Sequence, residues 1–177
     1  MSARTVRRLV LALLALAAVA VAAVFGLAGS SGKRKAPELP LEQLSGARAT
    51  LADLLSSSGG KPILVLFWAS WCGPCSKEAP AIERFARSSQ GRQRIVGVDW
   101  SDARSGARSF IARYGWTFPN VRDGEGTVGN SYGLENLPTT FVIGARRQIL
   151  AELHGPQSQA SLERALASAE RSGPAQA

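Results

Sequence analysis

Residues 67–75 read Phe-Trp-Ala-Ser-Trp-Cys-Gly-Pro-Cys, and this stretch decides the fold. Cys72 and Cys75 are the only cysteines in a chain of 177 residues. A Cys-x-x-Cys pair at the start of a helix can close a disulfide across one turn, and the helix N-terminus stabilises the first sulfur as a thiolate. We therefore expect a reversible two-electron thiol switch.

The residues on either side place the cysteines on a strand-to-helix turn. The preceding stretch, 62–68, is apolar and rich in branched and aromatic residues, which is typical of a buried strand. Residues 76–88 carry apolar side chains at helical spacing. Pro74 falls in the first helical turn, where a missing N–H is tolerated, and Gly73 lets a partner chain approach closely.

Residues 67–75 resemble the active-site segment of the thioredoxin superfamily. A second matching element, Leu137-Pro138-Thr139 followed by an apolar stretch, resembles the loop that carries a cis proline in that superfamily. A cis bond is plausible only before proline. The resemblance implies that the backbone of Leu137 pairs with an incoming peptide. It also implies that substrates contact Trp71, Gly73, Pro74, Leu137, Pro138 and Thr139.

The remaining pattern predicts an α/β fold with a central mixed sheet flanked by helices. Residues 95–99 predict a second buried strand, and 103–114 an amphipathic helix. Strand, helix and strand in succession imply a parallel pair. The further elements that we expect are a helical turn at 51–55, a hairpin of 141–144 with 148–153, and a closing helix over 158–171.

About 40 residues separate the second strand from the proline loop, which predicts an inserted helix-strand unit around 116–126. This insertion resembles the membrane-anchored, extracytoplasmic reductases of the TlpA/ResA group and their cytochrome c maturation relatives. The resemblance covers residues 37–171 approximately. It also draws attention to two positions near the cysteines. Leu66 stands where cytoplasmic thioredoxins have a buried aspartate, and Glu78 stands where the TlpA-like group has a candidate replacement proton acceptor.

Glu78 has two interpretations at this stage. It could assist proton transfer to and from the cysteines, or it could complement the helix dipole in the first turn. The catalytic residues predicted from the sequence are Cys72, Cys75 and, on the first interpretation, Glu78.

The N-terminus predicts a membrane anchor. Arg4, Arg7 and Arg8 precede an uncharged stretch in which residues 9–29 are long enough to span a bilayer as a helix. Basic residues flank both ends, so charge alone does not fix the orientation. A basic cluster before an apolar run is typical of an export signal, and this run is longer than that of a cleaved signal peptide. We therefore expect an uncleaved single-pass anchor with the domain outside the cytoplasm.

The expected organisation is a cytoplasmic N-terminus at 1–8, the anchor, a flexible linker at 30–40, a thioredoxin-like domain at 41–171 and a disordered tail at 172–177. Of the 21 basic residues, six flank the apolar segment, which leaves 15 against 13 acidic residues elsewhere. A domain so nearly neutral lacks the positive charge that nucleic-acid binding needs. The basic clusters at 92–94 and 146–147 are interpreted as solvated loop residues.

The predicted chemistry is thiol-disulfide exchange. Cys72 attacks a partner disulfide as a thiolate, and Cys75 resolves the mixed disulfide. The Gly-Pro dipeptide resembles reducing thioredoxins, which favours a reductant of exported protein disulfides or of apocytochrome c. We expect a monomer with no metal and no cofactor beyond the redox-active disulfide, supplied with electrons by a transmembrane donor.

Several alternatives are weighed against that chemistry. A structural disulfide is disfavoured because a four-residue loop constrains the unfolded chain little. A zinc site is disfavoured because the chain has one Cys-x-x-Cys and a single histidine, His154. Residues 69–72, Ala-Ser-Trp-Cys, lack the Thr-x-x-Cys of a peroxiredoxin-type peroxidase. A tethered binding module with idle cysteines remains open.

Overall fold

The structure is a computed structural model that describes residues 34–48 and 50–172. This part of the chain forms six strands and five helices, which alternate except that β6 follows β5 directly. In chain order they are β1 (Glu42–Ser45), α2 (Leu51–Ser57), β2 (Ile63–Trp68), α3 (Gly73–Arg87), β3 (Ile95–Trp100), α4 (Arg104–Tyr114), β4 (Asn120–Asp123), α5 (Thr127–Tyr132), β5 (Thr139–Ile143), β6 (Ile149–His154) and α6 (Gln159–Ser172).

The strands form one mixed sheet in the order β1-β4-β3-β2-β5-β6. Strands β2, β3 and β4 are mutually parallel, while β5 is antiparallel to β2 and β6 is antiparallel to β5. The central strand β2 is buried along its whole length, which explains its unbroken apolar sequence. Because α3 follows β2 directly, the two cysteines lie at the carboxyl end of the central strand.

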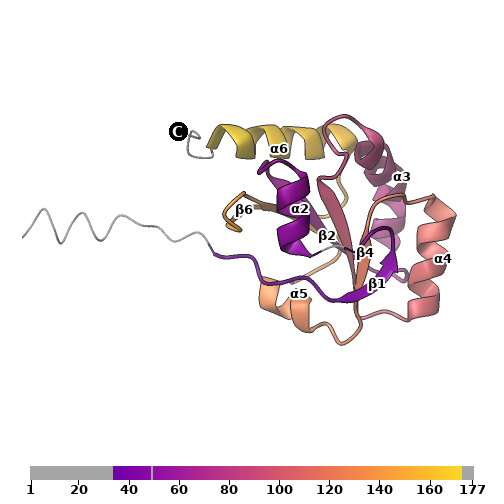
Figure 1. The fold of residues 1–177 in the computed structure, drawn as a ribbon. Coiled ribbons are helices and arrows are strands. Elements are labelled where there is room, and N and C mark those ends of the chain that lie inside the picture. The colour runs from indigo at the N-terminus through magenta and orange to yellow at the C-terminus, as the bar shows by residue number, and fades with distance from the viewer. Residues whose placement is uncertain (1–33, 49, 173–177) are drawn as a thin grey trace, which may run out of the picture. The chain divides into compact units, whose positions relative to one another are not determined.

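Alternate residues of β2 supply the two halves of the core. Leu64, Leu66 and Trp68 pack with α3, α4 and α6, whereas Ile63, Val65 and Phe67 pack with α2 and α5. Figure 1 shows α3 and α4 on one side of the sheet and α2 and α5 on the other. This alternation, with a period of two residues, agrees with a sheet covered on both faces. The expected thioredoxin-like α/β architecture is therefore present in the described residues.

The predicted elements after the cysteines are found within a few residues of their expected bounds. Helix α4 matches the helix expected at 103–114. The inserted unit expected around 116–126 contains strand β4, which extends the sheet beside β3, and the next helix, α5, begins just after that range. Strand β1 was not predicted. All four of its residues are only half-buried, so its sequence lacks the alternation that marks a strand.

The prediction of a flexible linker at 30–40 is wrong for residues 34–40, which pack against the domain. Ala36 and Leu39 are buried, and the Ala36 N–H donates to the Arg147 carbonyl at 2.7 Å. The Arg147 side chain also forms an ion pair with Glu38 at 2.5 Å. The two apolar residues of this segment provide the buried area, so the compact unit begins at Arg34 rather than at residue 41. Arg147 is consequently not a purely solvated residue.

Arg94 also differs from its expected place in a solvated loop. Its side chain is buried, its Nε donates to the Pro62 carbonyl at 2.9 Å, and its guanidinium pairs with Glu170 of α6 at 2.7 Å. A buried arginine is stable only when its charge and N–H groups are paired in this way. Arg94 thus links Pro62, the residue before strand β2, to the closing helix.

Within the described ranges, no helix has the length and apolar character needed to cross a membrane. The anchor predicted at 9–29 and nearly all of the predicted tail lie outside those ranges.

Candidate active site

Helix α3 begins at the disulfide. Cys72 is its N-cap residue, and the Cys75 backbone N–H donates to the Cys72 sulfur at 3.1 Å. The two sulfurs are joined as a disulfide. A sulfur that accepts an N–H bond at a helix N-terminus is stabilised as a thiolate once the disulfide is reduced. The geometry therefore suits Cys72 as the attacking sulfur.

The two cysteines differ in access to solvent. Cys72 is 4% exposed and lines an open pocket of about 370 Å³, whereas Cys75 is 1% exposed and does not line it. The pocket brings together five of the residues predicted from sequence and four that were not predicted. Its lining consists of Trp71, Cys72, Gly73, Pro74, Trp100, Leu134, Glu135, Asn136 and Leu137.

The peptide bond between Leu137 and Pro138 is cis, as the resemblance implied. Leu137 contributes to the pocket, but Pro138 and Thr139 are buried and do not line it. The Pro138 carbonyl accepts the Gly155 N–H at 2.9 Å, so this part of the loop is held to the end of β6. The predicted contacts of Pro138 and Thr139 with substrate stay a prediction.

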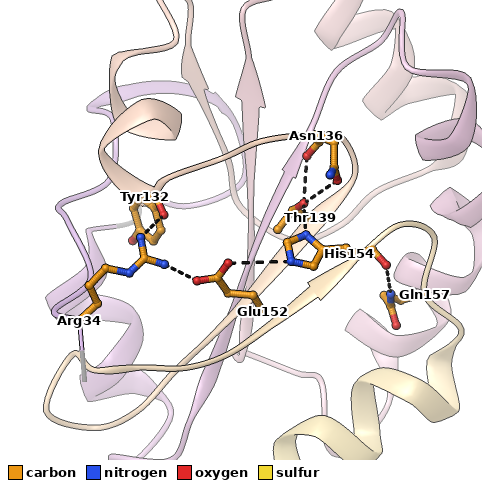
Figure 2. Close-up of polar contacts among 7 residues, drawn as sticks. All are labelled: Arg34, Tyr132, Asn136, Thr139, Glu152, His154 and Gln157. Atoms are coloured by element: carbon orange, nitrogen blue, oxygen red, sulfur yellow. Dashed lines mark hydrogen bonds and ion pairs between the residues drawn. The ribbon is translucent and has the colours of Figure 1, made fainter. Parts of the chain in front are cut away.

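The Thr139 hydroxyl serves the loop rather than the pocket. It donates to the Asn136 carbonyl at 2.9 Å and lies 3.4 Å from His154 Nδ1. Figure 2 shows His154 between Thr139 and Glu152. One carboxylate oxygen of Glu152 faces His154 Nε2, and the other pairs with Arg34. These polar contacts connect the first described residue of the domain to the loop that borders the pocket.

Trp71 is held at the rim of the pocket. It is 58% exposed, yet its indole Nε1 donates to the Ser101 carbonyl at 3.1 Å, and its ring centre lies 6.3 Å from that of Trp100. An exposed aromatic side chain fixed by a hydrogen bond offers contact area with little conformational freedom to lose. Trp71 is therefore suited to contact a bound partner.

Glu78 is buried on the same face of α3 as Cys75, one helical turn further on. Its exposed fraction is only 3%. The Gln157 backbone N–H donates to Glu78 Oε2 at 2.8 Å, and no described group donates to Oε1. Burial raises the pKa of the carboxyl from 4.5 to about 7, and the Gln157 N–H opposes this only in part. A pKa near neutrality fits a group that gains and loses a proton.

Two buried acids beside this site escaped the sequence prediction. Asp99 ends the predicted strand 95–99, and Asp102 lies in the turn before α4. Asp102 Oδ2 accepts the Ser70 backbone N–H at 2.5 Å, two residues before Cys72. For Asp99, the available sequence signal was a carboxylic acid in an otherwise apolar strand, because acids are almost never fully buried unless they are paired.

The sequence profile of the AhpC/TSA family matches residues 33–151 of this chain. The thiol-disulfide oxidoreductase ResA of Bacillus subtilis is 33% identical over 129 residues, which cover 72% of this chain and 69% of the relative. The thioredoxin-like protein YneN of the same organism is 30% identical over 137 residues, covering 75% of this chain and 77% of YneN.

Solved structures show the same similarity. A putative thiol:disulfide interchange protein DsbE from Chlorobium tepidum matches with a TM-score of 0.67 and 26% identity, over 77% of this chain and 96% of the other. StoA from Bacillus subtilis matches with a TM-score of 0.62 over 73% of this chain and 96% of its own, and at 23% identity it supports the fold alone.

Proposed function

Since the chain belongs to the AhpC/TSA family and is a thiol-disulfide oxidoreductase of thioredoxin-like fold, we propose that it reduces disulfides of exported proteins at the outer face of a membrane. The observation that carries the proposal is the Cys72–Cys75 disulfide, whose Cys72 lines a pocket that Leu137 also borders. The extracytoplasmic location is supported by the basic and apolar pattern of residues 4–29.

The cycle begins with the reduced protein. The Cys72 thiolate attacks one sulfur of the partner's disulfide, which forms a mixed disulfide and releases the partner's other sulfur as a thiolate. The Cys75 thiolate then attacks Cys72, which frees the second partner thiol and leaves the Cys72–Cys75 disulfide. Two electrons pass to the partner, and a reductant must later return two electrons to the protein.

Glu78 supports this cycle as a proton carrier. Cys75 is buried, so its thiol has no direct exchange with solvent, and the neighbouring buried carboxyl with a pKa of about 7 can take up the proton that Cys75 loses. The dipole interpretation is less favoured, because a carboxylate that merely complements the helix dipole has its pKa lowered rather than raised.

The experiment that tests the mechanism traps the partner. A Cys75→Ser variant should accumulate mixed disulfides through Cys72 that dissolve on addition of a thiol reductant. Cys72→Ser and the double variant are the matched controls and should trap nothing. Absence of any mixed disulfide in Cys75→Ser would leave the tethered binding module as the better interpretation, and trapped apocytochrome c would narrow the role to cytochrome c maturation.

The direction of the reaction needs its own measurement. A reductant should have a Cys72–Cys75 reduction potential close to that of thioredoxin, about −270 mV. A value near that of DsbA, about −120 mV, would make the protein an oxidant. Labelling of Cys72 in intact cells by a membrane-impermeant thiol reagent, after mild reduction, tests the location, because a cytoplasmic cysteine stays unlabelled.

A further inference from the structure

The pocket beside Cys72 is lined by two tryptophan rings. Trp71 and Trp100 both line it, and their ring centres lie 6.3 Å apart. The Trp71 indole N–H donates to the Ser101 carbonyl, and the Trp100 indole N–H donates to the Gly126 carbonyl at 3.3 Å. Because both N–H groups are already used, the two rings offer the pocket aromatic surface rather than free hydrogen-bond donors.

The Trp100 ring is held firmly by the backbone of helix α5. A Cβ at Gly129 would lie 2.5 Å from Trp100 Cδ1, and a Cβ at Gly126 would lie 2.9 Å from its Nε1. The ring therefore packs directly against two glycines at the start and middle of that helix. An aromatic side chain fixed in this way has little freedom to lose when a partner binds.

Glu135 is the only charged residue among the described residues that line this pocket. Its side chain is exposed, and none of the ion pairs within the described ranges involves it. The backbone on either side of it is held in place. The Leu134 N–H donates to the Gly129 carbonyl at 2.9 Å, and the Asn136 carbonyl accepts the Thr139 hydroxyl at 2.9 Å. The carboxylate is thus presented from a fixed position in the loop.

The surroundings of this carboxylate are acidic, although the chain as a whole is basic. Residues 123–145 contain three acidic residues and no lysine or arginine. Arg34 donates to a backbone carbonyl of this segment, but its charge is paired with Glu152. Arg122, which precedes the segment, is paired with Glu42. The pocket therefore carries a negative charge that no described cation pairs with.

A carboxylate next to aromatic and aliphatic surface matches the side chain of lysine or arginine. The long apolar stem of such a side chain can pack on Leu134 and the two rings while its charged end reaches Glu135. Tryptophan rings also attract a cation that lies over them. An acidic side chain in the same place would be repelled.

We propose that Glu135 is a specificity-determining residue, which selects substrates with a lysine or arginine close to the cysteine that Cys72 attacks. The inference rests on the proposed function, because the pocket is a substrate subsite only if Cys72 attacks partner disulfides. Cys72 and Glu135 line the same pocket, and successive residues of an extended peptide are about 3.3 Å apart. The basic residue therefore belongs within two positions of the reacting cysteine.

The test measures reduction of disulfide-linked peptides by the reduced full-length chain. The peptides differ at one position, which holds lysine, glutamine or glutamate and lies one or two residues before or after the cysteine. At low ionic strength, kcat/KM for the best-placed lysine peptide should exceed that of its glutamine counterpart by about 3- to 10-fold, and the glutamate peptide should be slowest. At about 1 M salt the charge preference should shrink, because the carboxylate is exposed and screened.

Variants at position 135 assign the preference to this residue. Glu135→Gln should reduce the lysine preference to about twofold or less, and Glu135→Lys should make the glutamate peptide faster than the lysine peptide. Glu125→Gln removes the same charge from an exposed glutamate that does not line the pocket, and it should keep the wild-type preference. A lysine preference that is absent in the wild type, or equally large in Glu135→Gln, overturns the proposal.

A second measurement needs no turnover. The oxidised chain is titrated with the lysine peptide, its cysteine replaced by serine, while NMR follows the indole N–H signals of Trp71 and Trp100. These signals should shift in the wild type and shift less in Glu135→Gln at the same peptide concentration. Equal shifts in both proteins would contradict the role of Glu135.

The two measurements separate this inference from the proposed function. A wild type that reduces all three peptides at equal rates overturns the selection by Glu135 and leaves the cysteine cycle intact. A chain that binds the lysine peptide through Glu135 but reduces no disulfide contradicts the proposed function alone.

Discussion

The Glu78 carboxyl in helix α3 accepts the backbone N–H of Gln157, from the turn before α6, at 2.8 Å. This single hydrogen bond joins the helix that carries the disulfide to the segment that closes the fold. Because the other Glu78 oxygen is buried without a partner among the described residues, the bond satisfies only half of the carboxyl group. The energetic consequence depends on pH, as the first two predictions show.

Stability should fall as pH rises from about 4.5 to about 7. The native state holds the Glu78 proton up to a pKa of about 7, whereas the unfolded chain releases it near 4.5. The stabilisation is thus full below the lower value and is lost between the two, a difference of about 3 kcal/mol. Asp99, whose pKa is also raised, acts in the same direction. Denaturant unfolding of the oxidised chain at pH 5 and pH 8 measures this fall.

Glu78→Gln should reduce that fall by most of the Glu78 contribution, because the amide does not titrate. Glu125→Gln replaces an exposed glutamate and should leave the fall unchanged. An equal fall in wild type and Glu78→Gln would contradict the buried, protonated state of Glu78.

Thiol reactivity offers a second measurement of Glu78. In the reduced wild type, the alkylation rate of the cysteines should show a step near pH 7 in addition to the titration of the thiols themselves, since ionisation of Glu78 adds a negative charge beside Cys75. Glu78→Gln should lack this step. An unchanged profile would restrict Glu78 to an interaction with the helix.

Removal of the Tyr132 hydroxyl should detach the N-terminal segment. Tyr132 is fully buried, and its hydroxyl donates to the Pro37 carbonyl at 2.9 Å. Tyr132→Phe keeps the ring contacts with Phe67 and Phe141 but leaves that carbonyl without its donor, which should cost about 1–2 kcal/mol. Limited proteolysis within residues 34–40 should become faster, and cleavage at an unchanged rate would show that the segment is held by its apolar residues alone.

Gly97→Ala tests the packing between neighbouring strands. A Cβ at Gly97 would lie 2.0 Å from Asn120 Oδ1 and 2.7 Å from Trp68 Nε1, and both side chains are fully buried. Neither can move into solvent, so overpacking should lower the free energy of unfolding by about 1–3 kcal/mol. Thermal unfolding measures the loss, and Gly73→Ala is the control because a Cβ there meets no atom within 4 Å.

Trp71→Ala should weaken the interaction with substrates more than it slows the chemical step. Loss of an aromatic anchor worth about 1–2 kcal/mol corresponds to a KM increase of roughly 5- to 30-fold. Leu41→Ala removes the other large apolar side chain that is exposed among the described residues; it does not line the pocket, and its loss should leave KM unchanged. A fall in kcat at constant KM would instead place Trp71 in control of the sulfur chemistry.

The sequence was most informative where a local pattern of residues is compatible with only one kind of secondary structure. The buried strand 62–68 and the helix after Cys72 were predictable, because an unbroken apolar run and a helical period each favour one local structure. The proline loop at Leu137 was predictable only from its resemblance to that of the thioredoxin superfamily, since most X-Pro bonds are trans. Strand β1 and the docked segment 34–40 were not predictable. Their stability comes from partners distant in sequence, Arg122 and Val121 for β1 and Arg147 for the segment.

The candidate site divides in the same way. The cysteines, Trp71 and Leu137 could be found from motifs, and all of them line or adjoin one pocket. Asp102 could not, because its importance arises from a single contact with Ser70, 32 residues away. Glu78 was identified by position, but only its burial distinguishes the proton carrier from a surface carboxylate.

Under the proposed function, the slight exposure of Cys72 limits the folding state in which a partner protein can be reduced. With 4% of Cys72 exposed at the lining of the pocket, a disulfide fixed on a rigid, folded surface would reach its sulfur less readily than one in an extended chain. A chain that is still extended can enter the pocket and present its sulfur. Reduction would therefore precede folding of the partner, and a partner that folds first would be protected from this enzyme by its own shape.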